Sequence, residues 1–175
     1  MYNARHRRVK RSPAYSLIIL AASLWCASIL LPPVVASIEG PTPVVSQQLY
    51  KFFSSFCHQY TSRSLFIFDH KLGVCARCSA IYFGFLVGIL AVPLVSRRTH
   101  YRTVHWLVIG LAPMVLDVVL NFTGISPSSD TTRIATGLFF GVIAALALVP
   151  ILETALLEVI HFREQSQRIH YESKA

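Results

Sequence analysis

Charged residues are scarce in this sequence. They make up 14% of its 175 residues, whereas hydrophobic residues make up 54%, and the mean hydropathy is +0.54. A soluble domain of this length needs a more highly charged surface. The composition therefore excludes an ordinary water-soluble protein and predicts that the lipid bilayer contacts much of the molecule.

Acidic residues are fewer still. Eight Asp and Glu stand against sixteen Lys and Arg, which leaves a net charge of +8. In a soluble protein such an excess favours nucleic-acid binding. Here the basic residues form short clusters between apolar runs, and no basic face with interleaved aromatic residues is present. We therefore predict no nucleic-acid partner, because such clusters are typical of the loops of a membrane protein.

Four apolar segments are long enough, or nearly so, to cross a bilayer. A hydrocarbon core of about 30 Å takes about 20 helical residues. A backbone in lipid must satisfy its hydrogen bonds within the segment, which requires helices. The predicted fold is all-α, an integral membrane four-helix bundle that forms a single membrane domain over residues 1–175. Its expected spans are residues 14–37, 79–95, 103–120 and 131–152.

The first span has the basic start and the apolar run of a secretory signal peptide. This apolar run is too long for a typical signal, and no clean small-residue cleavage site precedes Glu39. We therefore expect a retained membrane anchor.

Three clusters of Lys and Arg set the expected orientation. With four spans, all three lie on one side of the membrane, which the positive-inside rule makes cytoplasmic. We expect a multi-pass protein of the inner (plasma) membrane, with both termini and a tail, residues 153–175, in the cytoplasm and the loop of residues 38–78 outside. The clusters are Arg5, Arg7, Arg8, Lys10 and Arg11, then Arg97, Arg98 and Arg102, then Arg163, Arg168 and Lys174. The basic residues on the outer side are Lys51, Arg63, Lys71, Arg77 and Arg133.

The outer loop contains one helical pattern. In VVSQQLYKFFSSF, residues 44–56, five apolar side chains fall on roughly one face of a helix. This pattern predicts a short amphipathic helix that lies in the outer membrane interface. An irregular aromatic loop that covers the bundle is the alternative.

Small residues recur every four positions in two of the expected spans. Stripes of this kind let helix backbones approach closely in lipid, so we expect close helix packing along both. The stripes are Ala80, Gly84 and Gly88 in the second span, and Gly137, Gly141 and Ala145 in the fourth.

Asp117 is an ionisable residue near the outer end of the third span. A charge in hydrocarbon costs several kcal/mol unless it is paired or neutralised, so Asp117 should face the interior of the bundle. We expect Arg133 to be its partner, with Arg77 as the second choice. One interpretation is a structural ion pair that fixes helix packing. The other is a carboxylate that handles protons or binds substrate.

Three of the four cysteines lie close together in the sequence. Cys75 and Cys78 form a CARC motif at the mouth of the second span, and Cys57 stands eighteen residues earlier, beside His58. Two thiols three residues apart at a helix start share a face and can close a disulfide or bind one metal. A helix N-terminus also stabilises a thiolate. The fourth, Cys26, stands alone in the first span and is interpreted as a small packing residue.

A metal site is the first interpretation of these cysteines. Cys57, Cys75 and Cys78, with His58 or His70, make a Cys₃His set that suits zinc. His70 is the sterically easier of the two, because adjacent residues such as Cys57 and His58 rarely both reach one metal.

Two other interpretations remain open. In the redox interpretation, Cys75 and Cys78 cycle between dithiol and disulfide, and Cys57 acts as a shuttle or resolving thiol. The layout is similar to that of membrane thiol oxidases that pass electrons to quinone, although those usually carry a second cysteine pair. In the structural interpretation, a disulfide staples the loop of a non-catalytic accessory subunit.

Several short blocks carry a family resemblance. They are CHQ at 57–59, RSLF at 63–66, CARCSAIYFG at 75–84, PMVLD at 113–117 and TTRIATGLFFG at 131–141. Over about residues 50–145 the chain resembles a family of predicted bacterial membrane proteins known as domain of unknown function 2085. Two departures from its pattern are Ser79-Ala80, where threonine-glycine is more usual, and Asn121, where a glutamine is expected nearby. The resemblance implies signature positions at Cys57, His58, Gln59, Arg63, Cys75, Arg77, Cys78, Tyr82, Asp117 and Arg133.

The sequence thus predicts a polytopic membrane protein of unassigned reaction with an outward-facing Cys/His cluster, favoured as a zinc site. A quinone-coupled thiol–disulfide oxidoreductase is the alternative, and whether the protein is an enzyme stays open. Its partner is the lipid bilayer, and a homo-oligomer or a larger membrane complex is undecided. Candidate catalytic residues are Cys75, Cys78, Asp117, Arg133 and Arg77.

Overall fold

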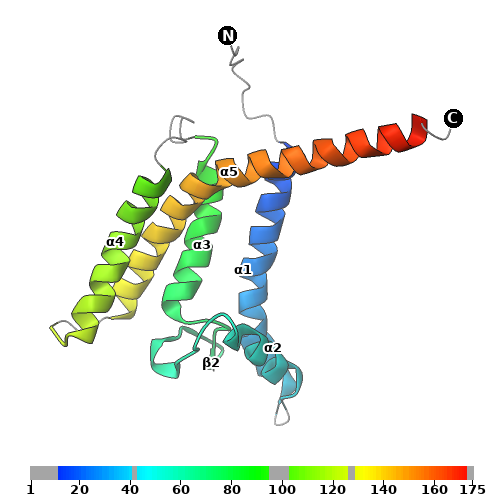
Figure 1. The fold of residues 1–175 in the computed structure, drawn as a ribbon. Coiled ribbons are helices and arrows are strands. Elements are labelled where there is room, and N and C mark those ends of the chain that lie inside the picture. The colour runs from blue at the N-terminus through cyan, green and yellow to red at the C-terminus, as the bar shows by residue number, and fades with distance from the viewer. Residues whose placement is uncertain (1–11, 41–42, 95–102, 126–128, 173–175) are drawn as a thin grey trace.

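The computed structural model describes residues 12–40, 43–94, 103–125 and 129–172. The described residues are mostly helical, which confirms the predicted helical class. In chain order the elements are α1 (Pro13–Glu39), α2 (Val45–Ser54), the 3-10 turn η1 (Thr61–Arg63), β1 (Phe66–Ile67), β2 (His70–Lys71), α3 (Ala76–Ala91), α4 (Thr103–Phe122) and α5 (Asp130–Glu172) (Figure 1).

α1, α3, α4 and the first half of α5 lie side by side (Figure 1), with α3 and α5 parallel to each other and α1 and α4 running in the opposite direction. α3 packs against α5, α5 also packs against α4, and α1 packs against α3. The strands β1 and β2 form an antiparallel hairpin, and this hairpin and α2 lie against one end of α1. We call the end of the bundle that holds α2, the hairpin and the first turn of α3 the loop end.

Three of the described helices are long and apolar enough to cross a membrane. They are Pro13–Glu39, Val104–Phe122 and Asp130–Ile160. The helix expected at residues 79–95 is α3, which has 16 residues and is therefore about 24 Å long. Three spans are thus supported by length and composition, and the fourth stays a prediction.

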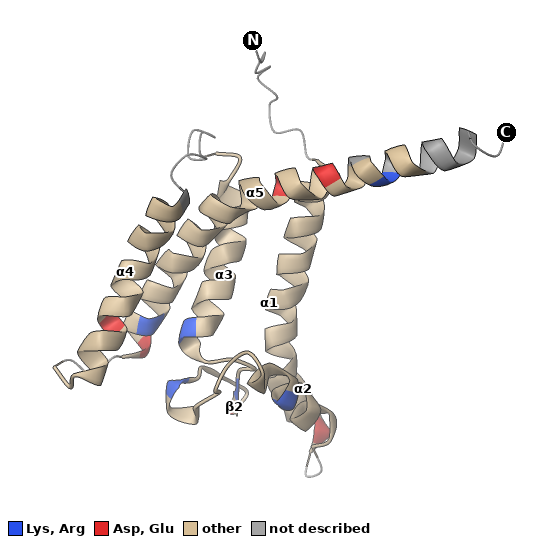
Figure 2. Cartoon of the chain, in the orientation of Figure 1, with Lys and Arg blue, Asp and Glu red and all other residues tan. Residues whose placement is uncertain are grey.

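Charged residues leave an uncharged zone in the middle of the bundle. Figure 2 shows them near the loop end and on the C-terminal half of α5. In α5 the charges stop at Arg133 and resume at Glu153, an interval of about 30 Å at 1.5 Å per residue. That interval equals the thickness of a lipid core, so the hydrophobic part of α5 fits one crossing.

The amphipathic helix expected at residues 44–56 is present as α2, and the alternative of an irregular loop is wrong. Phe53 on this helix is buried, whereas Val45 and Phe52, and Phe56 just beyond its end, are about half exposed. Phe53 packs with Ile29 of α1 in an apolar cluster. One side of α2 therefore holds the loop end together, while other apolar side chains remain available to a surrounding interface.

A proline inside α1 leaves a backbone carbonyl of this helix free to accept a hydrogen bond from the loop of residues 38–78. Pro33 has no N–H, so the carbonyl oxygen of Ile29 lacks its usual donor in the helix. The backbone N–H of Gly73 donates to this oxygen at 3.2 Å. The segment between β2 and α3 is therefore hydrogen-bonded to α1 at Ile29.

α5 continues well beyond the fourth expected span. It contains Pro150, and Figure 1 shows that it changes direction and crosses over the start of α1. Proline is a usual cause of such a change in direction. At the crossing, Ser12 Oγ donates a hydrogen bond to Glu153 Oε1 at 2.7 Å, and the hydroxyl of Tyr15 donates to the carbonyl of Ile89 at 2.7 Å. These contacts join the beginning of α1 to α3 and α5.

The predicted small-residue stripes form the contact between α3 and α5. A Cβ added at Gly84 would lie 2.5 Å from the carbonyl oxygen of Leu138, and one at Gly88 would lie 2.6 Å from Ala145 Cβ. From the other side, a Cβ at Gly141 would overlap the carbonyl of Ile81. The expectation of close helix packing is confirmed, and the two backbones touch where no larger residue fits.

The contact predicts that Gly84→Ala destabilises the protein. The added methyl group would meet the Leu138 backbone, and overpacking of this kind costs about 1–3 kcal/mol, or roughly 2–12 °C in Tm for a chain of this size. Thermal unfolding of detergent-purified protein measures the shift. Val87→Leu is the matched control, because Val87 lies on the exposed side of the same helix. A Tm for Gly84→Ala equal to that of the control would contradict the close contact.

Candidate functional site

Gln59 positions the first cysteine block. Its backbone adopts a left-handed conformation with φ 51°, which costs a non-glycine residue about 1–2 kcal/mol. Its buried side-chain Nε2 donates to the carbonyl oxygens of Tyr50 at 2.8 Å and Gly73 at 2.7 Å. Because Tyr50 belongs to α2 and Gly73 precedes Cys75, this one amide ties together the two segments that carry the cysteines.

The start of α3 brings together Cys57, Cys75 and Cys78. Cys57 is buried just beyond α2, where its backbone N–H donates to the carbonyl of Phe53 at 3.0 Å. Cys75 is the N-cap residue of α3, and Cys78 lies in its first turn. The backbone N–H of Cys75 donates to Cys57 Sγ at 3.3 Å. All three sulfur atoms lie within 4.8 Å of one another, so the predicted cysteine cluster is confirmed.

The cluster stabilises a thiolate. A hydrogen bond from the Cys78 thiol is the largest effect, and it lowers the pKa of Cys75 to about 5, with further help from the Cys78 and Arg77 backbone and from Cys57. Burial acts in the opposite direction. Cys75 is the N-cap residue of α3, and the positive end of the helix dipole also favours a thiolate there. The cluster therefore provides an anionic sulfur with two neighbouring thiols in contact range.

All four cysteines are among the described residues, and all four are free thiols. Cys26 is buried in α1, and its Sγ contacts the carbonyl oxygen of Tyr82 at 3.5 Å. Its sulfur is not one of the three that lie within 4.8 Å of one another. Cys26 is therefore separate from the cluster.

The two predicted histidine ligands lie in different places. His58 lines the same pocket as the cysteines, and its ring stacks parallel to that of Tyr60 with centroids 6.0 Å apart. His70 lies in β2, opposite Ile67. Among the described residues, no histidine nitrogen joins the three sulfurs within the 4.8 Å group. Ligation by His58 stays a prediction, and the expectation that His70 reaches the metal more easily finds no support in its position.

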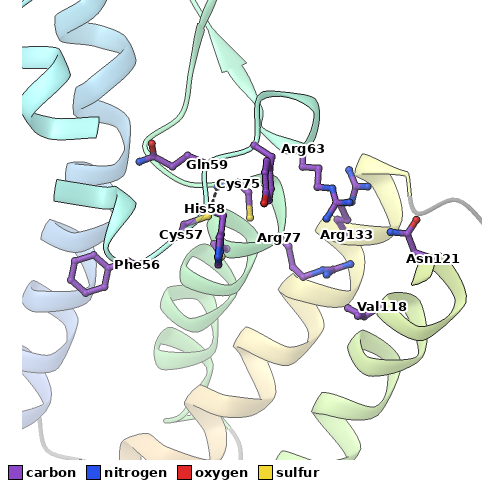
Figure 3. A pocket seen from close by; sticks show the side chains of 12 residues that line it. Phe56, Cys57, His58, Gln59, Arg63, Cys75, Arg77, Val118, Asn121 and Arg133 are labelled. Carbon is purple, nitrogen blue, oxygen red and sulfur yellow. Dashed lines mark hydrogen bonds between the residues drawn. The ribbon is translucent and has the colours of Figure 1, made fainter. Parts of the chain in front are cut away.

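The cluster forms one wall of a pocket of about 270 Å³ at the loop end. Figure 3 shows that the pocket is built from the loop after α2, the start of α3 and the facing ends of α4 and α5. Aromatic, sulfur-containing and basic side chains line it together. The lining residues are Phe56, Cys57, His58, Gln59, Tyr60, Arg63, Cys75, Arg77, Cys78, Val118, Asn121 and Arg133.

Asp117 does face the interior, but its partner differs from the first expectation. Arg77 Nη2 donates to Asp117 Oδ2, and the two side chains are 23% and 11% exposed. Arg133 instead pairs with Asp130 at 2.9 Å, three residues earlier in the same helix. Arg77, the second choice, is therefore the partner that the structure shows for Asp117. Arg133 meets Asp130 one turn away at little entropic cost, while Arg77 reaches across from α3 to α4.

Sequence reasoning named Arg77 and Arg133 as candidate catalytic residues and Arg63 as a signature position, but it did not predict that the three arginines line one pocket. Arg63, Arg77 and Arg133 all line it, although they come from η1, α3 and α5. A signal was present, because these are three of the five basic residues expected on the outer side, against the usual charge bias of membrane proteins.

Comparison with known proteins also indicates a membrane protein. Residues 57–147 match the family model described as "Predicted membrane protein (DUF2085)". An uncharacterized protein of Methanocaldococcus jannaschii is 34% identical over 143 residues, which cover 78% of this chain and 91% of that protein. An uncharacterized protein of Methanothermobacter thermautotrophicus is 27% identical over 107 residues, 61% of this chain and 96% of that protein. No solved structure matches the chain.

Both relatives are archaeal, so the description of the family as bacterial is too narrow. The matched residues begin at Cys57 and end within α5. They therefore contain the cysteine cluster and all three arginines of the pocket.

The lowered pKa predicts an unusual pH dependence for Cys75. A thiolate with a pKa of about 5 should be alkylated by iodoacetamide at a nearly constant rate from pH 8 to pH 6, with the rate falling by half near pH 5. An ordinary thiol, with a pKa of about 8.5, loses most of its reactivity over the same range. The rate is measured by mass spectrometry of the Cys75 peptide in chelator-treated protein.

Cys78→Ala supplies the matched control for this experiment. It removes the hydrogen bond that contributes most to the shift, so the pH of half-maximal rate should rise. A wild-type rate that halves above pH 8 would contradict the proposed role of this hydrogen bond.

Proposed function

Because the chain belongs to the family of predicted membrane proteins DUF2085, we propose that it is a multi-pass membrane protein that binds a transition metal, with zinc preferred, at its outer face. One observation carries the proposal: Cys57, Cys75 and Cys78 place their sulfurs within 4.8 Å of one another. Two of these residues are close in sequence, but the third comes from a segment eighteen residues away.

The donor set favours zinc. Thiolates are soft ligands that select zinc over hard cations such as magnesium or calcium. With a Zn–S distance of about 2.3 Å, sulfurs around a tetrahedral zinc are about 3.8 Å apart. Sulfurs within 4.8 Å need only a small inward movement to reach that spacing. The lowered pKa of Cys75 also supplies one ligand already deprotonated at neutral pH.

Three protein ligands leave one position of a tetrahedral metal for a further ligand. The pocket lies against the three cysteines, so the proposed fourth position opens into it. His58 lines the pocket and can supply a nitrogen if its ring leaves Tyr60. Sites with three protein ligands and one exchangeable position are typical of zinc that acts on a bound molecule.

The proposed membrane arrangement has four spans with both termini in the cytoplasm. α3 is short for a span, but it lies against both α1 and α5, and a bilayer can thin locally around a short segment. The protein then lies in the plasma membrane with the loop end on its outer side. The three clusters of Lys and Arg described above fall on the inner side, as the positive-inside rule requires.

Thiol–disulfide exchange coupled to quinone is the second candidate. It is favoured by the Cys75 thiolate, which accepts a hydrogen bond from Cys78. Formation of a Cys75–Cys78 disulfide would release two electrons and the Cys78 proton, and a quinone would accept these and one proton from solvent to become a quinol. The count of alkylatable thiols before and after addition of quinone separates this candidate from the metal site. A fixed count would exclude it and leave a non-catalytic accessory subunit as the remaining alternative to the metal.

The metal proposal predicts about one zinc per purified chain, because a Cys₃ site binds a single ion. The double variant Cys75→Ser, Cys78→Ser should lose this zinc, since only Cys57 of the cluster remains. Metal analysis of detergent-purified protein measures the content. Cys26→Ser is the control, because Cys26 lies outside the cluster, and it should keep the wild-type content. Equal zinc in the double variant and the wild type would defeat the proposal.

The proposed topology predicts that two exposed serines, once replaced by cysteine, differ in their accessibility to a reagent that cannot cross the membrane. In a variant in which all four cysteines are serine, Ser62→Cys in η1 should react with a membrane-impermeant maleimide in intact spheroplasts. Ser166→Cys in α5 should react only after permeabilisation. Both positions are exposed, so neither result depends on opening of the fold. Labelling of both positions before permeabilisation, or of Ser166→Cys alone, is incompatible with the proposed orientation.

A further inference from the structure

The pocket beside the cysteine cluster has a strongly positive wall. Arg63, Arg77 and Arg133 line it from three different elements, and no described Asp or Glu is among the lining residues. Figure 3 shows their side chains extending to the same side of the pocket. Arg77 and Arg133 are each paired with a carboxylate that does not line the pocket, and an anion placed between the three guanidinium groups would be attracted by all of them.

The arginines keep hydrogen-bonding capacity beyond their ion pairs. A guanidinium has five N–H donors. Arg133 uses one nitrogen for Asp130, and Arg63 lies over the ring of Tyr60 at 5.7 Å. Arg77 uses Nη2 for Asp117, while its Nε is buried without a hydrogen-bond partner among the described residues. A buried N–H of this kind costs free energy unless something in the pocket accepts it.

Planar guanidinium groups match the oxygens of phosphate, which accepts several charge-assisted hydrogen bonds at once. A pocket of about 270 Å³ has room for a phosphate and part of the group that carries it. The cysteine cluster adjoins the same space, so an oxygen held by the arginines can also approach the proposed metal.

We propose that this pocket binds a phosphate group, held by Arg63, Arg77 and Arg133, with one phosphate oxygen at the exchangeable fourth position of the metal. This inference rests on the proposed metal site and names the class of molecule that the site takes. The phosphate belongs either to a soluble molecule or to a lipid headgroup, since both offer the same oxygens to the arginines.

Cobalt provides a test that separates this inference from the metal proposal. The full-length protein, purified in detergent, is loaded with Co²⁺, whose thiolate charge-transfer and d–d absorption bands report the ligands of the site. Inorganic phosphate is then titrated in, with chloride at equal ionic strength as the control. We expect phosphate, but not chloride, to shift the d–d bands in a saturable manner.

Two variants test the arginines. Arg63→Gln and Arg133→Gln each remove a basic group whose described partners are an aromatic ring and an exposed carboxylate, so both should fold. Each should raise the apparent Kd for phosphate about tenfold or more, as expected for loss of a charge-assisted contact. Arg163→Gln is the matched control, because Arg163 is exposed on α5 and does not line the pocket, and it should bind phosphate like the wild type.

The outcomes are distinct. Absence of a cobalt–thiolate band would defeat the metal proposal itself. A normal band that phosphate does not shift would overturn the phosphate inference alone. The same holds if all variants bind phosphate equally, since the arginines would then only offset the charge of the thiolates.

Mixed micelles with phosphatidic acid, against micelles with phosphatidylcholine, form the second arm of the experiment. A band shift at lower concentration with phosphatidic acid than with inorganic phosphate assigns the site to a lipid headgroup, and the reverse order assigns it to a soluble phosphate. Both results support the inference.

Discussion

The close contact between α3 and α5 is the constraint on which the rest of the structure depends. Its outermost point is Gly137, where an added Cβ would lie 2.7 Å from the carbonyl oxygen of Arg77. Because the two backbones touch there, the first turn of α3 is held directly against α5. That turn carries Cys78 and Arg77, and the facing turn of α5 carries Arg133. The glycine contact therefore sets the width of the pocket between sulfur and guanidinium groups.

The loop of residues 38–78 is held by polar contacts among its own segments and to α1 more than by its hairpin. Its hairpin has only two residues in each strand, too few to be stable alone. Stability comes instead from the buried amide of Gln59, from the Tyr50 hydroxyl that donates to the carbonyl of Lys71 at 2.5 Å, and from the Gly73 contact to α1. This arrangement presents Cys57 to the start of α3 without a covalent link.

Much of the fold was readable from the sequence because membrane helices obey simple constraints. Apolar length located α1, α4 and the first part of α5, and the spacing of small residues located the α3–α5 contact. The proximity of Cys57 to Cys75 and Cys78 followed from their positions around one loop. The partner of Asp117 did not follow, because side-chain reach across helices depends on helix rotation. The same is true of the histidine ligand and of Arg63, whose positions depend on the turns at Gln59 and η1.

The pocket has a consequence for how the protein matures. Its walls are synthesised in order, first the segment with Cys57 and Arg63, then Cys75 and Arg77, and last Arg133 at the beginning of α5. A nascent chain that stops before α5 lacks both the packing partner of α3 and the arginine that α5 contributes to the basic wall. The carbonyl of Ile29, left free by Pro33, is available to the loop from the moment α1 is inserted. The pocket is therefore complete only once α5 has been synthesised and has packed against α3.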